Sequence, residues 1–212
     1  RIDGLFIERA MVRASDKLAI LSAEAPINQP MLTDGSAFFQ LQEEMRAAFE
    51  CTVIDLPRSM LVAHPHLMQD VQHVVLVTEL TLVAARDAIR LLAWLKSNAP
   101  QANVVLVANR VVASGPSEIS RKEFETTIER KIDHALLLDA KTVTGAAKVG
   151  KSIVEAGKSS KLGVSLIALV HQLCAATGDE AATDDKKGRA KGTTKSAGGS
   201  WFSSKPKKEK VA

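Results

Sequence analysis

Short apolar runs and longer segments with helical spacing alternate along the first 175 residues. The apolar runs are rich in Val, Leu and Ile and predict strands at 18–23, 51–55, 73–78, 103–109 and 134–138. Apolar residues that recur every three or four positions predict helices at 5–13, 36–49, 60–69, 80–96, 120–131, 144–155 and 161–175. Short strands that alternate with longer helices are typical of βαβ crossovers. The predicted fold class is therefore α/β, a three-layer parallel sheet with helices on both faces.

This architecture indicates where chemistry should lie. Nucleotides bind such sheets at the carboxyl ends of the strands. We therefore expect functional residues directly after the predicted strands, at 55–58, 78–80, 109–112 and 139–142.

Composition and charge divide the chain into a body and a tail. Of the 212 residues 46% are hydrophobic, 4% aromatic and 25% charged, which excludes collagen, coiled-coil rods and disulfide scaffolds. Residues 1–177 carry 19 basic and 19 acidic side chains, whereas residues 178–212 carry 9 and 5. The latter segment is rich in Gly, Ser, Thr and Lys, a composition that cannot offset the entropy of ordering. We expect a domain at 1–177 and a disordered basic tail at 178–212.

Several features bear on the cellular compartment. Cys51 and Cys174 lie far apart and neither has a CxxC partner, which predicts two buried thiols rather than a disulfide or a metal site. The chain has neither an apolar run of membrane-spanning length nor a signal peptide, so we expect a cytoplasmic protein. Because the first residue is Arg1 rather than Met, we also expect the polypeptide to start inside a longer protein.

The motif VIDLP places Asp55 at the end of a predicted buried strand. A carboxylate there can hold the water shell of a magnesium ion. An Asp that merely caps the following helix is the competing interpretation. The Mg²⁺ interpretation is favoured by the segments that follow the motif: VLVT, then a long predicted helix, then VLVANRV in the next predicted strand.

Together these segments resemble the deviant P-loop ATPases of the ParA/MinD type, and within them the Flp (Tad) pilus assembly ATPases of the CpaE/TadZ type. The resemblance covers roughly residues 1–175. It is carried by RIDGLFIERAMVRASDKLAILSAE, FECTVIDLPRS, VVLVTELTLVAARDAIRLL, VVLVANRV and AAKVGKSIVEAGKSSKLGVSLIALVHQL.

The resemblance implies a nucleotide site for ATP and Mg²⁺. Asp55 would be the catalytic residue that assists Mg²⁺ through water, and Pro57 would shape the switch loop. Asn109 and Arg110 would line the adenine pocket, where an amide offers both a donor and an acceptor to a purine edge. Asp139 would lie near the base, although Leu137 and Leu138 replace the proline that relatives carry before this acid.

The phosphate loop of the family has no counterpart in the expected position. It lies upstream of the region that resembles Arg1, so we expect an N-terminally truncated domain that alone neither binds nor hydrolyses ATP. The segment Gly145–Ser152 does fit the pattern GxxxxGK[ST], which is that of a phosphate loop. However, a working loop follows a strand directly, whereas here the predicted strand ends seven residues before Gly145 and a helical pattern intervenes. We predict a helix and its exit turn there.

The resemblance also implies a function and partners. They are ATP-dependent homodimerisation as a switch in Flp or type IV pilus assembly, pilus or secretion machinery proteins as partners, and a position at the cell pole or the inner face of the membrane. Two alternatives remain, a non-catalytic localisation scaffold of the same fold and a DNA-partitioning ATPase. The neutral body argues against extensive binding of nucleic acid.

Overall fold

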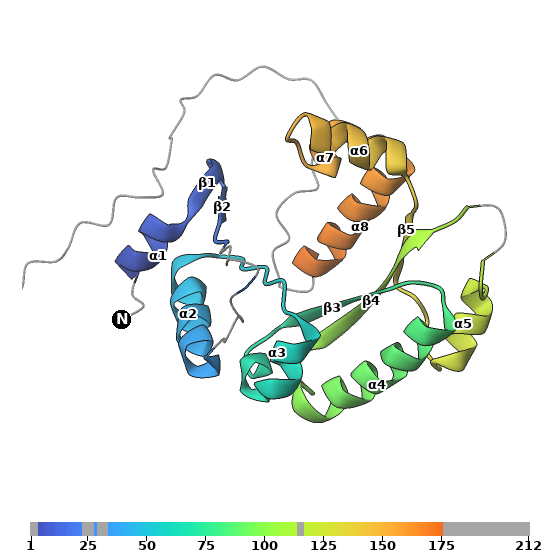
Figure 1. Cartoon of the computed structure of the whole chain (residues 1–212), viewed down its shortest axis with the longest axis horizontal. Coiled ribbons are helices and arrows are strands. Elements are labelled where there is room, and N and C mark those ends of the chain that lie inside the picture. The colour runs from blue at the N-terminus through green and yellow to red at the C-terminus, as the bar shows by residue number, and fades with distance from the viewer. Residues whose placement is uncertain (1–3, 23–27, 29–33, 114–116, 176–212) are drawn as a thin grey trace, which may run out of the picture.

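The computed structural model describes residues 4–22, 28, 34–113 and 117–175. The first elements are α1 (Gly4–Ala10) and a small antiparallel hairpin of β1 (Val12–Ser15) and β2 (Leu18–Ile20). The prediction of a buried strand at 18–23 is wrong, because Leu18 is 54% exposed and Ile20 is 46% exposed. The hairpin has no strand in common with the larger sheet (Figure 1).

The larger sheet consists of β3 (His73–Thr78), β4 (Asn103–Val111) and β5 (His134–Leu137). The strands are parallel and lie in the order β3-β4-β5. The connections run through α4 (Leu82–Asn98) and α5 (Arg121–Thr127). These crossovers confirm the predicted parallel sheet.

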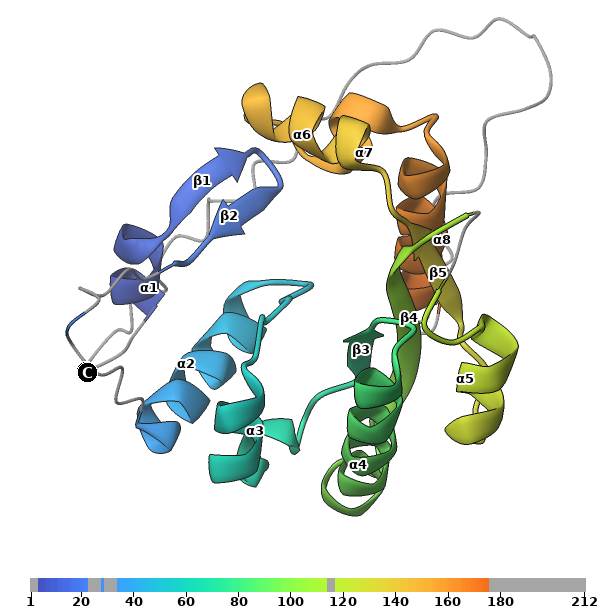
Figure 2. The ribbon, with the colours of Figure 1, turned by 45° about the vertical axis from the view of Figure 1, so that its right-hand side comes forward.

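Helices cover both faces of β4. On one face Leu106 and Ala108 are fully buried against α4 and α5, where Phe124 is the largest buried side chain. On the other face Val105 and Val107 lie under α8 (Lys161–Ala175). Figure 2 shows α4 and α8 on opposite sides of this strand. Apolar burial contributes about 25 cal/mol per Å². Because β4 buries apolar side chains on both of its faces, it is the centre of the fold. The helices on both sides of the sheet confirm the predicted three-layer arrangement.

A third apolar cluster lies beside the C-terminal half of α4. It receives side chains from α3 (Arg58–Ala63) and from the 3-10 helix η1 (Pro65–Met68), which follow α2 (Gly35–Ala48). An ion pair of 3.1 Å between Arg58 and Asp87 also joins α3 to α4. This cluster attaches the N-terminal half of the chain to the sheet.

The strand predicted at 51–55 does not form. Residues 51–57 have no regular secondary structure, and Val53 is 91% exposed. A strand satisfies its backbone polar groups through a neighbouring strand, and none of the described strands lies alongside this segment. Asp55 therefore does not stand at the end of a strand.

The region predicted as one helix at 144–155 is two helices, α6 (Ala140–Lys148) and α7 (Ile153–Gly157). Gly150 separates them with a φ of +62°. Its N–H donates to the carbonyl of Ala147, and the next N–H, of Lys151, donates to the carbonyl of Ala146. This is the Schellman pattern that ends a helix at a left-handed glycine.

A buried carboxylate fixes the segment between α5 and β5. The side chain of Glu125 is 8% exposed and accepts bonds from Arg121 Nε at 2.9 Å, Lys131 Nζ at 2.7 Å and the N–H of Ile132 at 3.1 Å. Lys131 and then Arg121 lower the pKa of Glu125 to about 2. The carboxylate is therefore ionised throughout the neutral range.

Other predictions have mixed outcomes. Both cysteines are exposed, so the prediction of buried thiols is wrong. The tail at 178–212 lies outside the described residues. Within the described part of the chain, no helix is long and apolar enough to cross a membrane.

The two glycines of the α6 region should respond oppositely to alanine. Gly145 lies inside α6, and the position that a Cβ would occupy is open space, so Gly145→Ala should stabilise the fold by about 0.5–1 kcal/mol. Gly150 has a positive φ, so Gly150→Ala should destabilise it by about 1–2 kcal/mol. Urea unfolding of both variants measures this, and equal losses of stability would contradict the helix and turn described above.

Removing the charge of Glu125 should lower stability in a pH-dependent way. Because its pKa is depressed from 4.5 to about 2, its contribution is complete above pH 5 and is lost as the pH falls toward 2. Glu125→Gln should lower the melting temperature by several degrees at pH 7, and the gap from the unsubstituted protein should shrink as the pH falls from 5 to 2. The matched control is Glu43→Gln, whose exposed partner Arg46 lies at 2.7 Å. An equal shift in the control would refute the buried network.

Candidate functional site

The carboxyl ends of the three parallel strands meet at one edge of the larger sheet. Glu79 follows β3, and Asp139 lies just after β5. Asn109 and Arg110 are among the last residues of β4. Parallel pairing brings Asn109, Arg110 and Asp139, which the sequence predicted, to the same edge. We call these four residues the edge cluster.

Arg110 owes its position to an irregularity in β4. The register of β4 against β5 shifts between Ala108 and Val111, and Arg110 has a φ of +54°. A left-handed conformation costs a non-glycine residue about 1 kcal/mol or more. Two contacts hold it there: the Arg110 N–H donates to Asn109 Oδ1 at 2.9 Å, and Arg110 Nη1 lies 3.4 Å from Glu79 Oε1. The guanidinium is thereby directed toward the end of β3.

Asn109 is half-buried beside this exposed ion pair. Its Oδ1 already accepts one bond, from the backbone of Arg110. No contact of its Nδ2 group is recorded within the described residues, so two N–H donors are available to a ligand. The residue therefore suits a ligand that presents an acceptor, such as a ring nitrogen of a purine.

The N-terminus of α4 completes the same edge. Thr81 Oγ1 accepts the N–H of Ala84 at 3.1 Å, and Glu118 Oε1 accepts the N–H of Leu82 at 3.0 Å. The first turn of α4 is thus capped by side chains of this chain itself. Its amides are not arranged as a free anion site.

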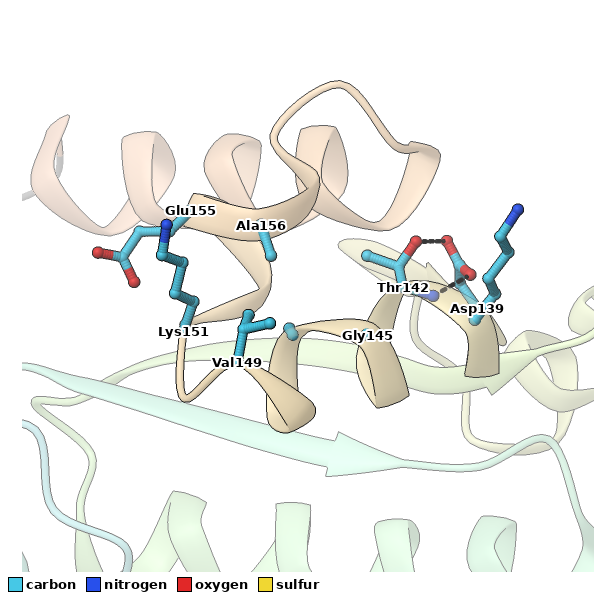
Figure 3. Close-up of a pocket in the computed structure, with 9 residues that line it drawn as sticks. Asp139, Thr142, Gly145, Val149, Lys151, Glu155 and Ala156 are labelled. Atoms are coloured by element: carbon cyan, nitrogen blue, oxygen red, sulfur yellow. Dashed lines mark hydrogen bonds between the residues drawn. The ribbon is translucent and has the colours of Figure 1, made fainter.

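Asp139 has a structural task at the start of α6. Its carboxylate accepts the Thr142 N–H at 3.0 Å and the Thr142 hydroxyl at 2.6 Å, and these bonds hold its pKa below the usual range. The residue also borders a solvent-open hollow of about 690 Å³ between α6 and α7, with Lys151 at the opposite end (Figure 3). Asp139 is therefore the member of the edge cluster that serves as the ionised N-cap of α6.

The late glycine-lysine motif is a helix and its exit turn, as predicted. The N–H groups of Gly150 and Lys151 bond to carbonyls of α6, and the N–H of Ser152 bonds to Glu155 Oε2 at 2.9 Å. The Ser152 hydroxyl in turn donates to the same carboxylate at 2.7 Å. A phosphate loop needs such amides to be free and directed at one anion. Here they are used within the chain.

Within the described residues, no hydrogen bond or ion pair joins Asp55 or Pro57 to the edge cluster. Asp55 is exposed on the irregular segment before α3, and no hydrogen bond or ion pair of its carboxylate is recorded within the described residues. The carbonyl of Pro57 accepts the N–H groups of Met60 and Leu61 at the start of α3. An exposed carboxylate without a protein partner fits the hard oxygen chemistry of Mg²⁺, which keeps several waters and takes one or two carboxylates.

A complete metal site is not preformed. Among the described residues, no three His, Cys, Asp or Glu side chains gather closely enough to hold a metal ion. Any Mg²⁺ at Asp55 would need water and phosphate oxygens as its other ligands, which is the usual arrangement for this ion.

Two members of this edge were not singled out from the sequence. Glu79 lies in one of the windows marked by the strand ends, but nothing in the local pattern distinguished it from its neighbours. Glu118 reaches the N-terminus of α4 across 36 residues, a contact that no local spacing indicates. Only the fold brings them beside Arg110 and α4.

Comparisons with known proteins place this geometry in a known fold. No protein-family profile and no curated protein matches the chain. Solved structures do match. The ParA family ATPase of Chlorobium tepidum TLS is 18% identical with a TM-score of 0.62, and the match covers 81% of this chain and 71% of that one.

Two MinD structures match at a similar level. The MinD cell division protein of Aquifex aeolicus is 17% identical with a TM-score of 0.60, over 84% of this chain and 72% of its own. The cell division ATPase MinD of Pyrococcus furiosus is also 17% identical, with a TM-score of 0.64, over 79% of this chain and 70% of its own. At these identities the likeness concerns the fold. The chain therefore has the α/β fold of the ParA/MinD ATPases.

Proposed function

We propose that this chain is the greater part of a ParA/MinD-like ATPase that acts in assembly of Flp-type pili. The observation that carries the ATPase proposal is the edge cluster, where a half-buried Asn109 stands at the carboxyl end of the central strand with free N–H donors. This is the edge of a parallel sheet at which nucleotides bind. The pilus assignment is supported by the sequence resemblance to the CpaE/TadZ ATPases.

The nucleotide base is the ligand that the edge cluster suits. Asn109 would donate to a ring nitrogen of adenine, and the planar guanidinium of Arg110 can stack on an aromatic ring or bond to it. Glu79 fixes the direction of Arg110 through the contact at 3.4 Å. Asp139 supports the rim as the cap of α6. These residues would bind the base and leave the phosphates to other groups.

Magnesium and the attacking water are the ligands that Asp55 suits. Its carboxylate would hold one or two waters of the Mg²⁺ shell, and Pro57 would restrict the backbone that carries it. Magnesium supplies charge stabilisation to the transferring phosphoryl group when it is bound. The chain's own contribution is therefore an exposed carboxylate on a segment whose backbone Pro57 restricts.

A switch follows if nucleotide binding favours a dimer. ATP shifts an equilibrium between monomer and homodimer only by its difference in affinity for the two states. Hydrolysis removes that difference and returns the monomer. The partners in this proposal are components of pilus or secretion machinery, and the site of action is the cytoplasmic side of the membrane or the cell pole.

A non-catalytic scaffold is the second candidate, favoured by a specific observation. The GxxxxGK[ST] segment, which matches the pattern of a phosphate loop, is a helix and turn whose amides are already bonded. A scaffold would keep the fold and the partner surfaces without nucleotide turnover. Calorimetry with Mg²⁺-ATP on the native gene product separates the two, since a scaffold gives no binding.

Asn109→Ala should weaken binding of Mg²⁺-ATP to the native gene product, whose intact mass is determined first in its source cells. Loss of one hydrogen bond to the base should raise Kd roughly tenfold, about 1.4 kcal/mol. The control is Asn103→Ala, an exposed asparagine at the opposite end of the same strand. Lys151→Ala should also leave Kd unchanged. Unchanged binding in Asn109→Ala, or binding abolished by Lys151→Ala, would contradict this assignment of the site.

Asp55→Asn should separate hydrolysis from binding. The amide keeps the size of the side chain and loses the charge that orients the Mg²⁺ shell, so turnover should fall at least about 100-fold while Kd for Mg²⁺-ATP changes little. Phosphate release from the native gene product measures turnover. A variant that hydrolyses ATP at the unsubstituted rate would restrict Asp55 to the local structure before α3.

A further inference from the structure

Positive charge collects in one short part of the chain. Residues 140–161, which run from the start of α6 to the start of α8, carry five lysines and one glutamate, a net charge of +4. Residues 1–139 carry 14 basic and 18 acidic side chains, a net charge of −4. Figures 1 and 2 both show α6 and α7 on the side of the sheet away from α4. An anionic partner would therefore meet this end of the molecule first.

The five lysines are exposed and have no close acidic partner. They are Lys141 and Lys148 on α6, Lys151 in the turn after it, Lys158 at the end of α7 and Lys161 at the start of α8. Of the lysines in the described part of the chain, only Lys131 has a recorded ion pair, which it forms with Glu125. The positive charge of residues 140–161 is therefore not neutralised by contacts within the described fold.

The two acids beside these lysines are already engaged as helix caps. Glu155 accepts the N–H of Ser152 at 2.9 Å and its hydroxyl at 2.7 Å, and Asp139 accepts the corresponding groups of Thr142 at 3.0 and 2.6 Å. These bonds are the main cause of the lowered pKa of each carboxyl group, and a neighbouring lysine is the smallest. The ammonium groups therefore remain available to an external anion.

The turn between α6 and α7 adds an exposed apolar side chain to these charges. Val149 is 63% exposed and stands in the sequence between Lys148 and Lys151. Figure 3 shows Val149 and Lys151 together at this turn. At a bilayer surface an aliphatic side chain can enter the apolar region while lysine ammonium groups stay among the headgroups. A valine flanked by lysines suits such a surface.

The backbone of the turn is already bonded, which also favours a membrane. The N–H groups of Val149 and Gly150 donate to the carbonyls of Ala146 and Ala147, both at 3.2 Å, and the N–H of Lys151 donates to Ala146 at 3.1 Å. Amides without a partner are costly to remove from water, and these three groups can leave water without that cost. The bonds that are incompatible with a phosphate loop thus suit the turn to insertion among lipids.

We propose that the turn between α6 and α7 docks this protein on an anionic lipid bilayer, with Val149 inserted between headgroups and Lys148 and Lys151 at the lipid phosphates. The other three lysines add attraction at longer range. Nucleic acid is the less suitable partner, because residues 131–175 contain no arginine and an exposed valine gains nothing from a phosphate backbone. The inference goes beyond the proposed function, since docking requires no nucleotide.

Co-sedimentation with lipid vesicles tests this docking. The 212-residue chain should bind vesicles of equal parts phosphatidylglycerol and phosphatidylcholine, and bind vesicles of phosphatidylcholine alone much more weakly. Lys148→Glu together with Lys151→Glu should lower the partition coefficient for the anionic vesicles at least about 25-fold, because each lysine near such a surface contributes about fivefold. Binding that this double variant leaves unchanged would place the attraction in another basic segment and overturn the proposal.

A matched double variant controls for net charge. Lys96→Glu together with Lys122→Glu makes the same change of charge at exposed lysines of α4 and α5. It should lower the partition coefficient less than about threefold, since these lysines lie away from the proposed contact. Equal losses in the two double variants would show that net charge alone drives binding, which would also overturn the proposal.

Matched valines test the insertion itself. Val149→Ser should lower the partition coefficient for anionic vesicles about fivefold, because the inserted apolar area is lost. Val62→Ser is the control, since Val62 lies on α3 and is 58% exposed, and it should leave binding unchanged. Equal binding by Val149→Ser and the unsubstituted chain would overturn insertion of the turn.

Melting temperatures show whether each variant folds. Should glutamate at positions 148 and 151 lower the melting temperature, Lys148→Gln together with Lys151→Gln should still give a loss of vesicle binding, smaller than that of the charge reversal. Duplex DNA of random sequence tests the other class of partner. A double variant that loses binding to DNA but keeps binding to vesicles would assign this surface to nucleic acid and overturn the proposal.

The vesicle assay contains no nucleotide, so its outcome is distinguishable from that of the ATP-binding test. Asn109→Ala should leave vesicle binding unchanged, because Asn109 belongs to the edge cluster and not to the turn. Loss of vesicle binding in Asn109→Ala would overturn the assignment of docking to the turn between α6 and α7.

Discussion

The burial of β4 on both faces is the constraint on which the rest of the structure depends. Leu106 and Ala108 require helices on one side, and Val105 and Val107 require a helix on the other. A strand covered in this way cannot slip by one residue, because every side chain would change faces. The register of β4 therefore sets the position of α4, α5 and α8, and with them the end of the strand at which Asn109 lies.

The candidate site arises where this regular pattern stops. The register shift before Val111 places Arg110 in a left-handed conformation, and the ion pair with Glu79 and the bond to Asn109 hold it there. Strain of this kind persists only where the surroundings fix it. The doubly buried strand provides that rigidity, so a polar cluster with directed donors forms at its end.

Sequence patterns were most reliable where partners lie within the chain. The strand at 73–78 and the helix at 161–175 have the predicted bounds. Local patterns could not indicate that Glu118 caps α4 from a distance. Asn109 and Arg110 were found from the resemblance, whereas the contact between Arg110 and Glu79 required the fold.

The two wrong strand predictions have a common physical origin. The apolar alternation of 51–55 and of 18–23 reports what those segments would bury beside neighbouring strands, and it carries no information about whether such neighbours exist in the same stretch of chain. Within the described part of the chain 51–57 has no strand partner and 18–20 pairs only within a small hairpin, and Val75 and Val77 are 38% and 56% exposed. Apolar alternation therefore predicts which side chains a segment could bury, and a strand forms only where a neighbouring strand pairs with it.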